Sequence, residues 1–217
     1  MYLSLKSPKS PEHMALKKMI YEKISNAVYR SGFATSQRAY DDANRDLIEG
    51  LDAIEATLAD RGPFIRGDII TDCDLLLLPT VLRFDKAYAT LFRAGGGSVR
   101  ILCKRESASD YPHIAEWAKR LWFLGLRGHR NAAIDKKHQM QNTIDIAAAV
   151  QSYHRSLYML CPSGIITGGI QTREQVEADL GLDVPSSQCE SWLNKPHLPV
   201  SSSVSPTSSI ARGTCTK

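Results

Sequence analysis

The sequence lacks a long apolar run, and this argues against both a membrane protein and a secreted one. A membrane-spanning helix needs about 18 or more consecutive apolar residues, and the longest run here is interrupted by Pro79 and Thr80. Residues 1–14 carry lysines and prolines but no apolar segment of signal-peptide length. We therefore expect a cytoplasmic protein that makes no contact with a membrane.

Cysteine is sparse and is not spaced as a ligand set. The 217 residues include five cysteines with no Cys-x-x-Cys pair, and the six histidines are scattered along the chain. Disulfide frameworks and zinc sites both need such spacings. The pattern therefore predicts reduced thiols and no metal site.

Charge of one sign is not concentrated either. The formal net charge of +4 is too small to indicate nucleic-acid binding without a basic face. The stretch Leu126–Asn142 is basic, but it has no interleaved aromatic side chains on which bases could stack. A solvated loop is favoured over a nucleic-acid patch, so we expect no nucleic-acid partner.

Self-contained catalytic motifs are missing as well. The sequence has no Gly-x-Ser-x-Gly elbow and no His-Glu-x-x-His pair. Gly95–Ser98 is glycine-rich, as phosphate-binding loops are, but no predicted strand precedes it and no Gly-Lys-Ser/Thr follows. A flexible loop is therefore favoured there over a phosphate cradle.

What the sequence does contain is helical periodicity. Apolar residues recur three and four positions apart, which is typical of helices that bury one face. The pattern predicts an all-α fold with helices over Ala15–Ser31, from Thr35 or Ser36 to Leu58, over Asp110–Trp122, and from a cap at Thr143 to about Tyr158. Helices joined by short connections pack as a bundle.

The helix that begins after Thr71 organises this bundle. Thr71 and Asp74 have the spacing of a capping box, in which each side chain bonds the backbone N–H of the other residue. The residues that follow, from Leu75 to Phe84, are apolar almost all round, which predicts a helix enclosed by others. Thr71 and Asp74 are therefore expected to act as a structural cap.

Composition divides the chain into three parts. We interpret residues 1–14 as a frayed leader, 15–170 as the helical domain, and 171–217 as a tail that is mostly disordered, because the end of the chain is rich in serine and proline. Within the tail, Gln171–Leu182 is a short amphipathic helix candidate.

Tyrosines are the main candidates for binding. A phenol combines an apolar ring with one polar tip, which suits a pocket for an aromatic substrate. Such side chains are more often core or rim residues than substrate contacts. The candidates are Tyr21, Tyr29, Tyr40, Tyr88, Tyr153 and Tyr158.

Three segments resemble a known family. NAVYRSGFATSQRAYDDA (Asn26–Ala43), ITDCDLLLLPTVLRFDKAY (Ile70–Tyr88) and SYHRSLYMLCPSGII (Ser152–Ile166) are similar to segments of the glutathionyl-hydroquinone reductases. These are also called xi-class glutathione transferases and are related to the omega class. The resemblance covers about residues 15–170 and implies the helical bundle of a glutathione transferase C-terminal domain.

The resemblance also implies a substrate site. In the family, quinone-derived substrates lie between two domains and contact tyrosines of the helical one. The family's tyrosines correspond to Tyr29 and Tyr153 here, and Tyr88 is a further candidate for the same cavity. The implied small-molecule partner is an aromatic quinone or hydroquinone, and a homodimer through the helical domain is a possible assembly.

The family's sulfur chemistry is expected to lie outside this chain. The resemblance implies glutathione as cosubstrate and a nucleophilic cysteine in a CPWA motif, both on a thioredoxin-like N-terminal domain that would precede Ala15. Cys161-Pro162 follows a predicted helix rather than starting one, so it does not replace that cysteine. We expect the substrate-binding half of a glutathione-dependent transferase or oxidoreductase, present without that domain as a fragment and without a catalytic residue of its own. The alternative is a noncatalytic interaction or ligand-binding module.

Overall fold

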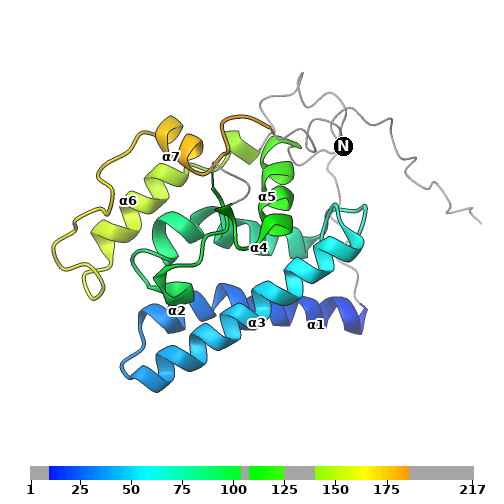
Figure 1. Cartoon of the computed structure of the whole chain (residues 1–217), viewed down its shortest axis with the longest axis horizontal. Helices are drawn as coiled ribbons and strands as arrows, with labels where there is room; N and C mark the ends of the chain where they lie inside the picture. The colour runs from blue at the N-terminus through cyan, green and yellow to red at the C-terminus, as the bar shows by residue number, and fades with distance from the viewer. Residues whose placement is uncertain (1–9, 104–107, 125–139, 186–217) are drawn as a thin grey trace, which may run out of the picture.

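The structure is a computed structural model that describes residues 10–103, 108–124 and 140–185. Within these ranges the chain forms helices and turns and no strand, apart from one antiparallel bridge between Phe64 and Gly67. The predicted all-α fold is confirmed (Figure 1). The α-helices are α1 Pro11–Met19, α2 Ala27–Gly32, α3 Gln37–Arg61, α4 Asp72–Arg83, α5 Pro112–Leu124, α6 Ile146–Ser156 and α7 Arg173–Asp179.

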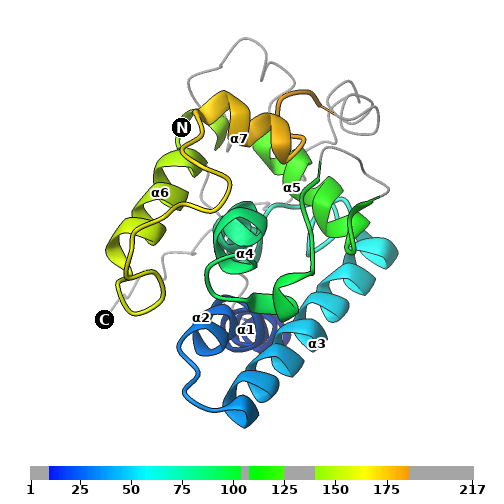
Figure 2. The same ribbon diagram turned by 60° about the vertical axis from the view of Figure 1, so that its left-hand side comes forward.

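Helix α4 lies in the middle of the bundle, as its composition predicts. Figure 2 shows α4 nearly end-on with the other helices around it, and α1, α5 and α6 pack against it. The predicted capping box of Thr71 and Asp74 is present. Leu77 and Leu78 are fully buried, whereas Leu75 is only partly buried, so one side of the helix is less enclosed than the sequence suggests.

The first predicted helix is divided into three pieces. It begins at Pro11 rather than Ala15, because the Ser10 hydroxyl accepts a hydrogen bond from the His13 backbone N–H and caps the helix four residues earlier. The segment Ile20–Ser25 then widens into a π-helical turn, and α2 follows. The predicted leader therefore extends too far, since residues 10–14 are ordered and His13 is completely buried.

Helix α3 supports two of its neighbours. It begins at the expected cap, Ser36. Its Glu55 carboxylate accepts hydrogen bonds from the backbone N–H groups of His113 and Ile114 at 2.8 Å each, which satisfies donors at the start of α5. Its Asn44 side chain accepts a 2.7 Å bond from Gly95 N–H.

The glycine-rich segment is a packed turn and not the flexible loop that its composition predicts. Gly95, Gly96 and Gly97 have φ values of 63°, 69° and 75°, a region that glycine adopts without a steric penalty. Gly95 is buried and bonded to Asn44. The three glycines therefore allow the chain to make a tight turn that packs against α3.

The last two helices also differ from the prediction. Helix α6 is capped by Asp145, whose carboxylate accepts from Ala148 N–H at 2.9 Å, while the Thr143 hydroxyl donates to the Met140 carbonyl instead. Helix α7 confirms the amphipathic candidate at Gln171–Leu182. Val176 of α7 and the leucines that follow the helix, Leu180 and Leu182, join the core, so the packed domain extends beyond residue 170. Most of the predicted tail, residues 186–217, lies outside the described residues.

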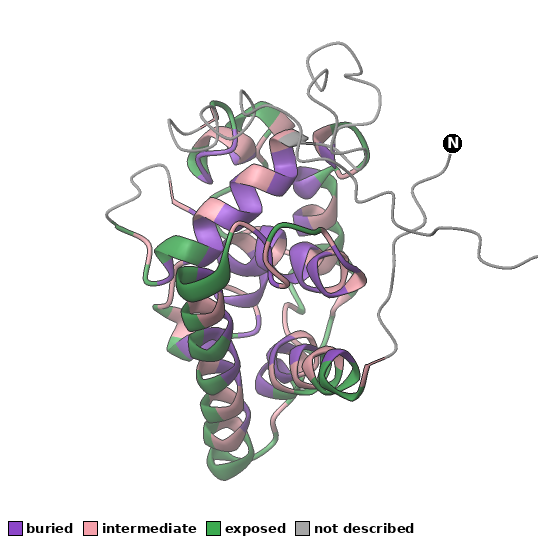
Figure 3. Cartoon of the chain, turned by 90° about the vertical axis from the view of Figure 1, so that its right-hand side faces the viewer, coloured by how far each residue is buried: buried purple, intermediate pink, exposed green. Residues whose placement is uncertain are grey.

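Burial follows the helix faces throughout. In Figure 3 buried residues gather on the inner sides of the helices and exposed residues on the outer sides. The expected inner face of α5 is confirmed; it comprises Ile114, Trp117, Ala118, Leu121 and Trp122. No helix in the described part of the chain combines the length and apolar character that crossing a bilayer requires.

Candidate functional site

The three tyrosines named as substrate contacts converge on one point. The hydroxyl oxygen of Tyr29 lies 2.7 Å from that of Tyr153 and 3.1 Å from that of Tyr88. The remaining pair, Tyr88 and Tyr153, is 3.0 Å apart. Three phenols from positions 29, 88 and 153 thus form a closed triangle of hydrogen bonds, which we call the tyrosine triangle.

Each member of the triangle comes from a different part of the bundle. Tyr29 is on α2, Tyr153 is on α6, and Tyr88 ends the π-helical turn Phe84–Tyr88 that follows α4. In that turn Ala89 N–H donates to the Phe84 carbonyl five residues back. A π-turn accommodates one more residue than an α-turn and often occurs at functional sites.

Phe92 forms the floor of the triangle. Its ring is completely buried and meets the rings of Tyr29, Tyr88 and Tyr153 edge-to-face at centroid distances of 5.4, 5.3 and 5.9 Å. Edge-to-face contacts at these distances are favourable. Phe92 therefore fixes the positions of the rings whose hydroxyls meet.

Arg83 places a positive charge at the triangle. Its Nη1 donates a 3.1 Å hydrogen bond to the Tyr153 hydroxyl, and its guanidinium carbon lies 5.6 Å from the centroid of the Tyr153 ring and 5.9 Å from that of Tyr88. Its Nε donates to the Pro79 carbonyl at 2.7 Å, which holds the side chain. Because the Tyr153 oxygen accepts from Arg83, its own proton remains available for a neighbouring oxygen.

Tyr29 and Tyr88 are neutral at physiological pH. Burial raises the pKa of Tyr29 above its ordinary value of 10.0, and burial raises the pKa of Tyr88 further, while the nearby Arg83 acts in the opposite direction on both. Desolvation has this effect because it disfavours the charged phenolate. Tyr29 and Tyr88 therefore keep their protons and can act as hydrogen-bond donors.

The other tyrosine candidates are not part of this cluster. Tyr21 and Tyr158 are 56% and 71% exposed, and the Tyr40 hydroxyl donates to the Arg93 carbonyl. The capping-box residues Thr71 and Asp74 are buried at the start of α4, as expected of a structural role.

No described cysteine has the setting of an activated nucleophile, which is a thiol at a helix start with a lowered pKa. Burial raises the pKa of the Cys73 thiol to about 11 and also raises the pKa of Cys103. The Cys161 thiol donates to the Ile165 carbonyl in the turn after α6, so it does not lie at a helix start. Cys189 and Cys215 lie outside the described residues.

Two features of the structure are missed by sequence reasoning. Arg83 and Phe92 join the triangle through contacts with residues up to 70 positions away, and only the four-residue spacing of Phe92 from Tyr88 is a usable helical signal. The structure also gathers His13, Asp72 and Cys73, a group that the sequence does not reveal because His13 falls in the predicted leader.

Comparisons with known proteins show which proteins the chain resembles. Residues 37–120 match the family described as the glutathione S-transferase C-terminal domain. The chain is 38% identical to glutathione S-transferase omega-like 2 of Schizosaccharomyces pombe over 119 residues, covering 54% of this chain and 35% of that protein. It is 32% identical over 159 residues to a glutathionyl-hydroquinone reductase of Sphingobium chlorophenolicum, covering 73% of this chain and 44% of the reductase.

A solved structure is also similar to this chain. The glutathione-bound structure of a glutathione transferase homologue from Escherichia coli K-12 superposes with a TM-score of 0.53 at 28% identity, covering 79% of this chain and 47% of that one. The chain spans about a third to a half of the length of these relatives. The helical bundle is therefore a glutathione S-transferase C-terminal domain, and its relatives include an omega-like glutathione S-transferase and a glutathionyl-hydroquinone reductase.

Proposed function

We propose that this chain is the substrate-binding helical half of a glutathione-dependent enzyme that reduces glutathionyl-hydroquinones. One observation carries the proposal: the hydroxyls of Tyr29, Tyr88 and Tyr153 meet within 3.1 Å of one another. The name of the Sphingobium relative and the glutathione in the Escherichia coli structure support the choice of reaction. The substrate would be an aromatic ring with a quinone or hydroquinone oxygen.

The triangle has the chemistry that such a substrate needs. A phenol hydroxyl both donates and accepts, and it rotates to suit a new partner, so a ring oxygen of the substrate can replace one hydroxyl as the acceptor. Tyr29 and Tyr153 are partly buried, whereas Tyr88 is 1% exposed. Tyr29 and Tyr153 would therefore meet the substrate, with Tyr88 behind them.

These donors would act on charge that develops during the reaction. Departure of a glutathionyl group from the ring leaves negative charge on the ring oxygens, and fixed hydrogen-bond donors stabilise such charge. Arg83 donates a hydrogen bond to the Tyr153 oxygen, which makes the Tyr153 hydroxyl a stronger donor to the substrate. The nucleophilic cysteine and the glutathione site would be supplied by a thioredoxin-like domain, so the chain would act as one part of a longer enzyme.

Binding of a quinone tests the first part of the proposal. Titration with menadione should show that Tyr29→Phe and Tyr153→Phe each weaken binding about five-fold, because each loses one hydrogen bond of about 1 kcal/mol. Tyr158→Phe is the matched control, since Tyr158 is 71% exposed. Equal affinity of the parent chain and all three variants would contradict the assignment.

Turnover tests the second part. The purified 217-residue chain with glutathione should not remove glutathione from a glutathionyl-hydroquinone, whereas fusion to the thioredoxin-like domain of a relative should give activity that falls in Tyr153→Phe. Unaided turnover by the chain would refute the division of labour. Quinone binding without activity in the fusion would favour a noncatalytic ligand-binding module, which the same triangle supports.

A further inference from the structure

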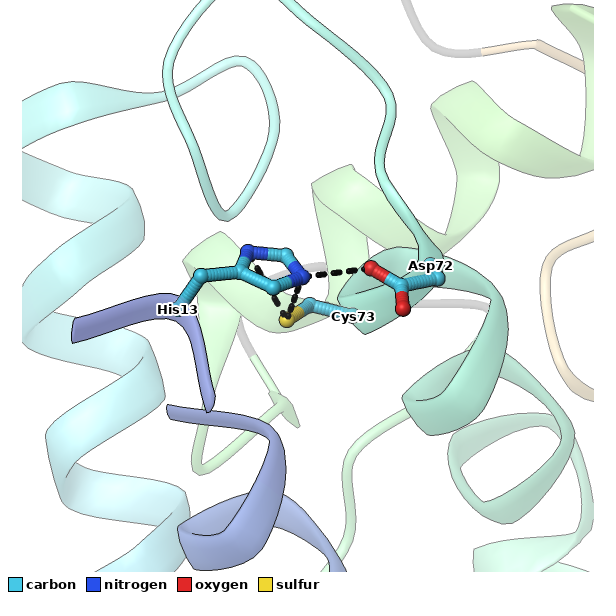
Figure 4. A group of neighbouring side chains, drawn as sticks. All are labelled: His13, Asp72 and Cys73. Atoms are coloured by element: carbon cyan, nitrogen blue, oxygen red, sulfur yellow. Dashed lines mark hydrogen bonds and ion pairs between the residues drawn. The ribbon is translucent and has the colours of Figure 1, made fainter. Parts of the chain in front are cut away.

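A second polar cluster lies at the start of α4, where three different metal-ligating side chains meet. Figure 4 shows His13 from α1 facing Asp72 and Cys73 from the first turn of α4. His13 Nε2 lies 2.6 Å from Asp72 Oδ1, and Cys73 Sγ lies 3.8 Å from each ring nitrogen of His13. The ligand atoms of all three residues lie within 4.8 Å of one another.

The cluster is held by two capped helix starts. Asp72 and Cys73 follow the capping box of α4, and His13 lies in the first turn of α1, which Ser10 caps. Because both backbones are fixed, the three side chains are brought together before any ion arrives. Preorganisation of this kind lowers the cost of binding.

The donor set selects a particular kind of ion. Imidazole nitrogen, thiolate sulfur and carboxylate oxygen together are typical of zinc, whereas magnesium and calcium prefer oxygen alone. A thiolate and a carboxylate also offer two negative charges to a divalent cation. Lys17 bonds the other oxygen of Asp72 at 2.7 Å, which leaves Oδ1 directed at His13.

The spacing of the donors is close to what zinc requires. Tetrahedral zinc with ordinary bond lengths places sulfur and nitrogen about 3.6 Å apart and nitrogen and oxygen about 3.3 Å apart. The sulfur–nitrogen distance is 3.8 Å here, and the nitrogen–oxygen distance of 2.6 Å would have to open by about 0.7 Å. Rotation of the His13 ring and the Asp72 carboxylate provides this change.

We propose that His13, Asp72 and Cys73 bind a zinc ion that joins α1 to the start of α4. His13 and Cys73 are completely buried, while the Asp72 side chain is 23% exposed, so the ion enters beside Asp72 and its fourth position faces solvent. Three protein ligands with an open fourth position are a common zinc arrangement. Nothing in the proposed reduction of hydroquinones uses this site, so the two proposals stand or fall separately.

Titration of the full 217-residue chain with zinc, in competition with a chromophoric chelator, tests the site. We expect one zinc equivalent that Cys73→Ala and His13→Gln each weaken at least ten-fold. Cobalt(II) at the same site should show thiolate-to-metal charge-transfer absorption in the near ultraviolet, which Cys73→Ala abolishes. Cys103→Ala and Cys161→Ala are the matched controls and should leave both signals unchanged.

A thermal measurement separates loss of the site from loss of the fold. Zinc should raise the melting temperature of the parent chain but not that of Asp72→Asn, whose circular dichroism should match the parent's. The proposal is overturned if the parent takes up no zinc, or if Cys73→Ala keeps the full affinity and stoichiometry. Either result would make the cluster an ordinary set of hydrogen-bonding contacts between α1 and α4.

Discussion

Asp74 accepts more hydrogen bonds than a helix-capping residue usually does. Its buried carboxylate accepts hydrogen bonds from the backbone N–H of Ile65, from both the N–H and the hydroxyl of Thr71, and from the Trp117 indole. One side chain therefore joins the segment before α4, the first turn of α4 and helix α5.

Replacing Asp74 by alanine should destabilise the protein by about 3–5 kcal/mol, because several buried donors lose their acceptor at once. Thr71→Ala should cost only about 1 kcal/mol, the usual value of an N-cap. Urea denaturation followed by circular dichroism measures both. Asp68→Ala, at an exposed position, is the control and should have little effect. Similar losses for Asp74→Ala and Thr71→Ala would show that the contacts of Asp74 with Ile65 and Trp117 contribute nothing.

Asp85 should make stability depend on pH. Burial raises the pKa of its carboxyl from 3.8 to about 6, against the lowering effect of hydrogen bonds from the backbone N–H groups of Leu102 and Ile101. The folded state therefore holds the proton more tightly than the unfolded state. The contribution to stability is present below about pH 4 and is lost as pH rises through about 6, by roughly 3 kcal/mol in total.

A comparison with Asp85→Asn isolates this effect, since the variant cannot titrate there. The free energy of unfolding of the parent should gain on that of the variant as pH falls from 7 to 4. Denaturation at several pH values measures the difference. A constant difference across that range would mean that Asp85 does not titrate as the structure indicates.

At the residue scale, local spacing was predictable and distant contacts were not. Thr71 and Asp74 could be paired because a capping box spans three residues. Tyr29 and Tyr153 required the family resemblance, since 124 positions separate them. The contact between His13 and Asp72 was not predictable, because the two residues are 59 positions apart and no local pattern relates them.

At the scale of elements, Gly32 sets how closely α2 approaches the floor of the tyrosine triangle. A Cβ atom at Gly32 would lie 2.2 Å from Cδ1 of Phe92 and 2.8 Å from its Cγ. Such a contact is far shorter than packed carbon atoms allow, and Phe92 is enclosed by the three tyrosines.

Gly32→Ala should therefore destabilise the protein by about 1–3 kcal/mol, the usual cost of overpacking, and it should weaken menadione binding by moving Tyr29. Denaturation and the quinone titration measure the two effects. The double variant Gly32→Ala/Phe92→Leu should be less destabilised than the two single changes added together. Strict additivity would show that Gly32 and Phe92 do not oppose each other.

Helix positions followed from periodicity, while the irregular elements did not. A spacing of three and four residues locates α3 and α5 well. It does not reveal the π-turn Ile20–Ser25, because the apolar residues across that turn, Ile20, Ile24 and Ala27, are still four and three positions apart. The packed turn at Gly95–Gly97 is not predictable from its composition, because the side chain that accepts its hydrogen bond, Asn44, lies 51 residues away.

At the scale of the whole molecule, one apolar core includes residues from both ends of the described chain. It extends from Ile20 to Leu182 and includes Trp117 and Trp122 of α5. Helix α7 belongs to this core, and Lys86 bonds its Asp179 at 2.6 Å. The all-α class and the central position of α4 were predictable from composition. The inclusion of α7 was not, because the serine-rich sequence beyond it suggested a tail.

If the core is one cooperative unit, a change at the end of α7 should lower the stability of the whole bundle. Leu180→Ala should lower the free energy of unfolding by about 2–5 kcal/mol. Circular dichroism and near-ultraviolet signals from the buried tryptophans should shift to the same midpoint. Val184→Ala, at a 64% exposed position, is the control. An earlier separate transition would mean that α7 detaches while the rest stays folded.

The two π-turns give the chain an unusual sensitivity to length. One precedes Tyr29, where Asn26 N–H bonds the Tyr21 carbonyl, and the other ends at Tyr88, where Ala89 N–H bonds the Phe84 carbonyl. Each absorbs an additional residue, and successive residues of an α-helix are rotated by about 100°. Deleting one residue from the first or the second turn would therefore rotate Tyr29 or Tyr88, respectively, away from the other two phenols. Relatives that gain or lose a single codon there could change ligand without altering any of the three tyrosines.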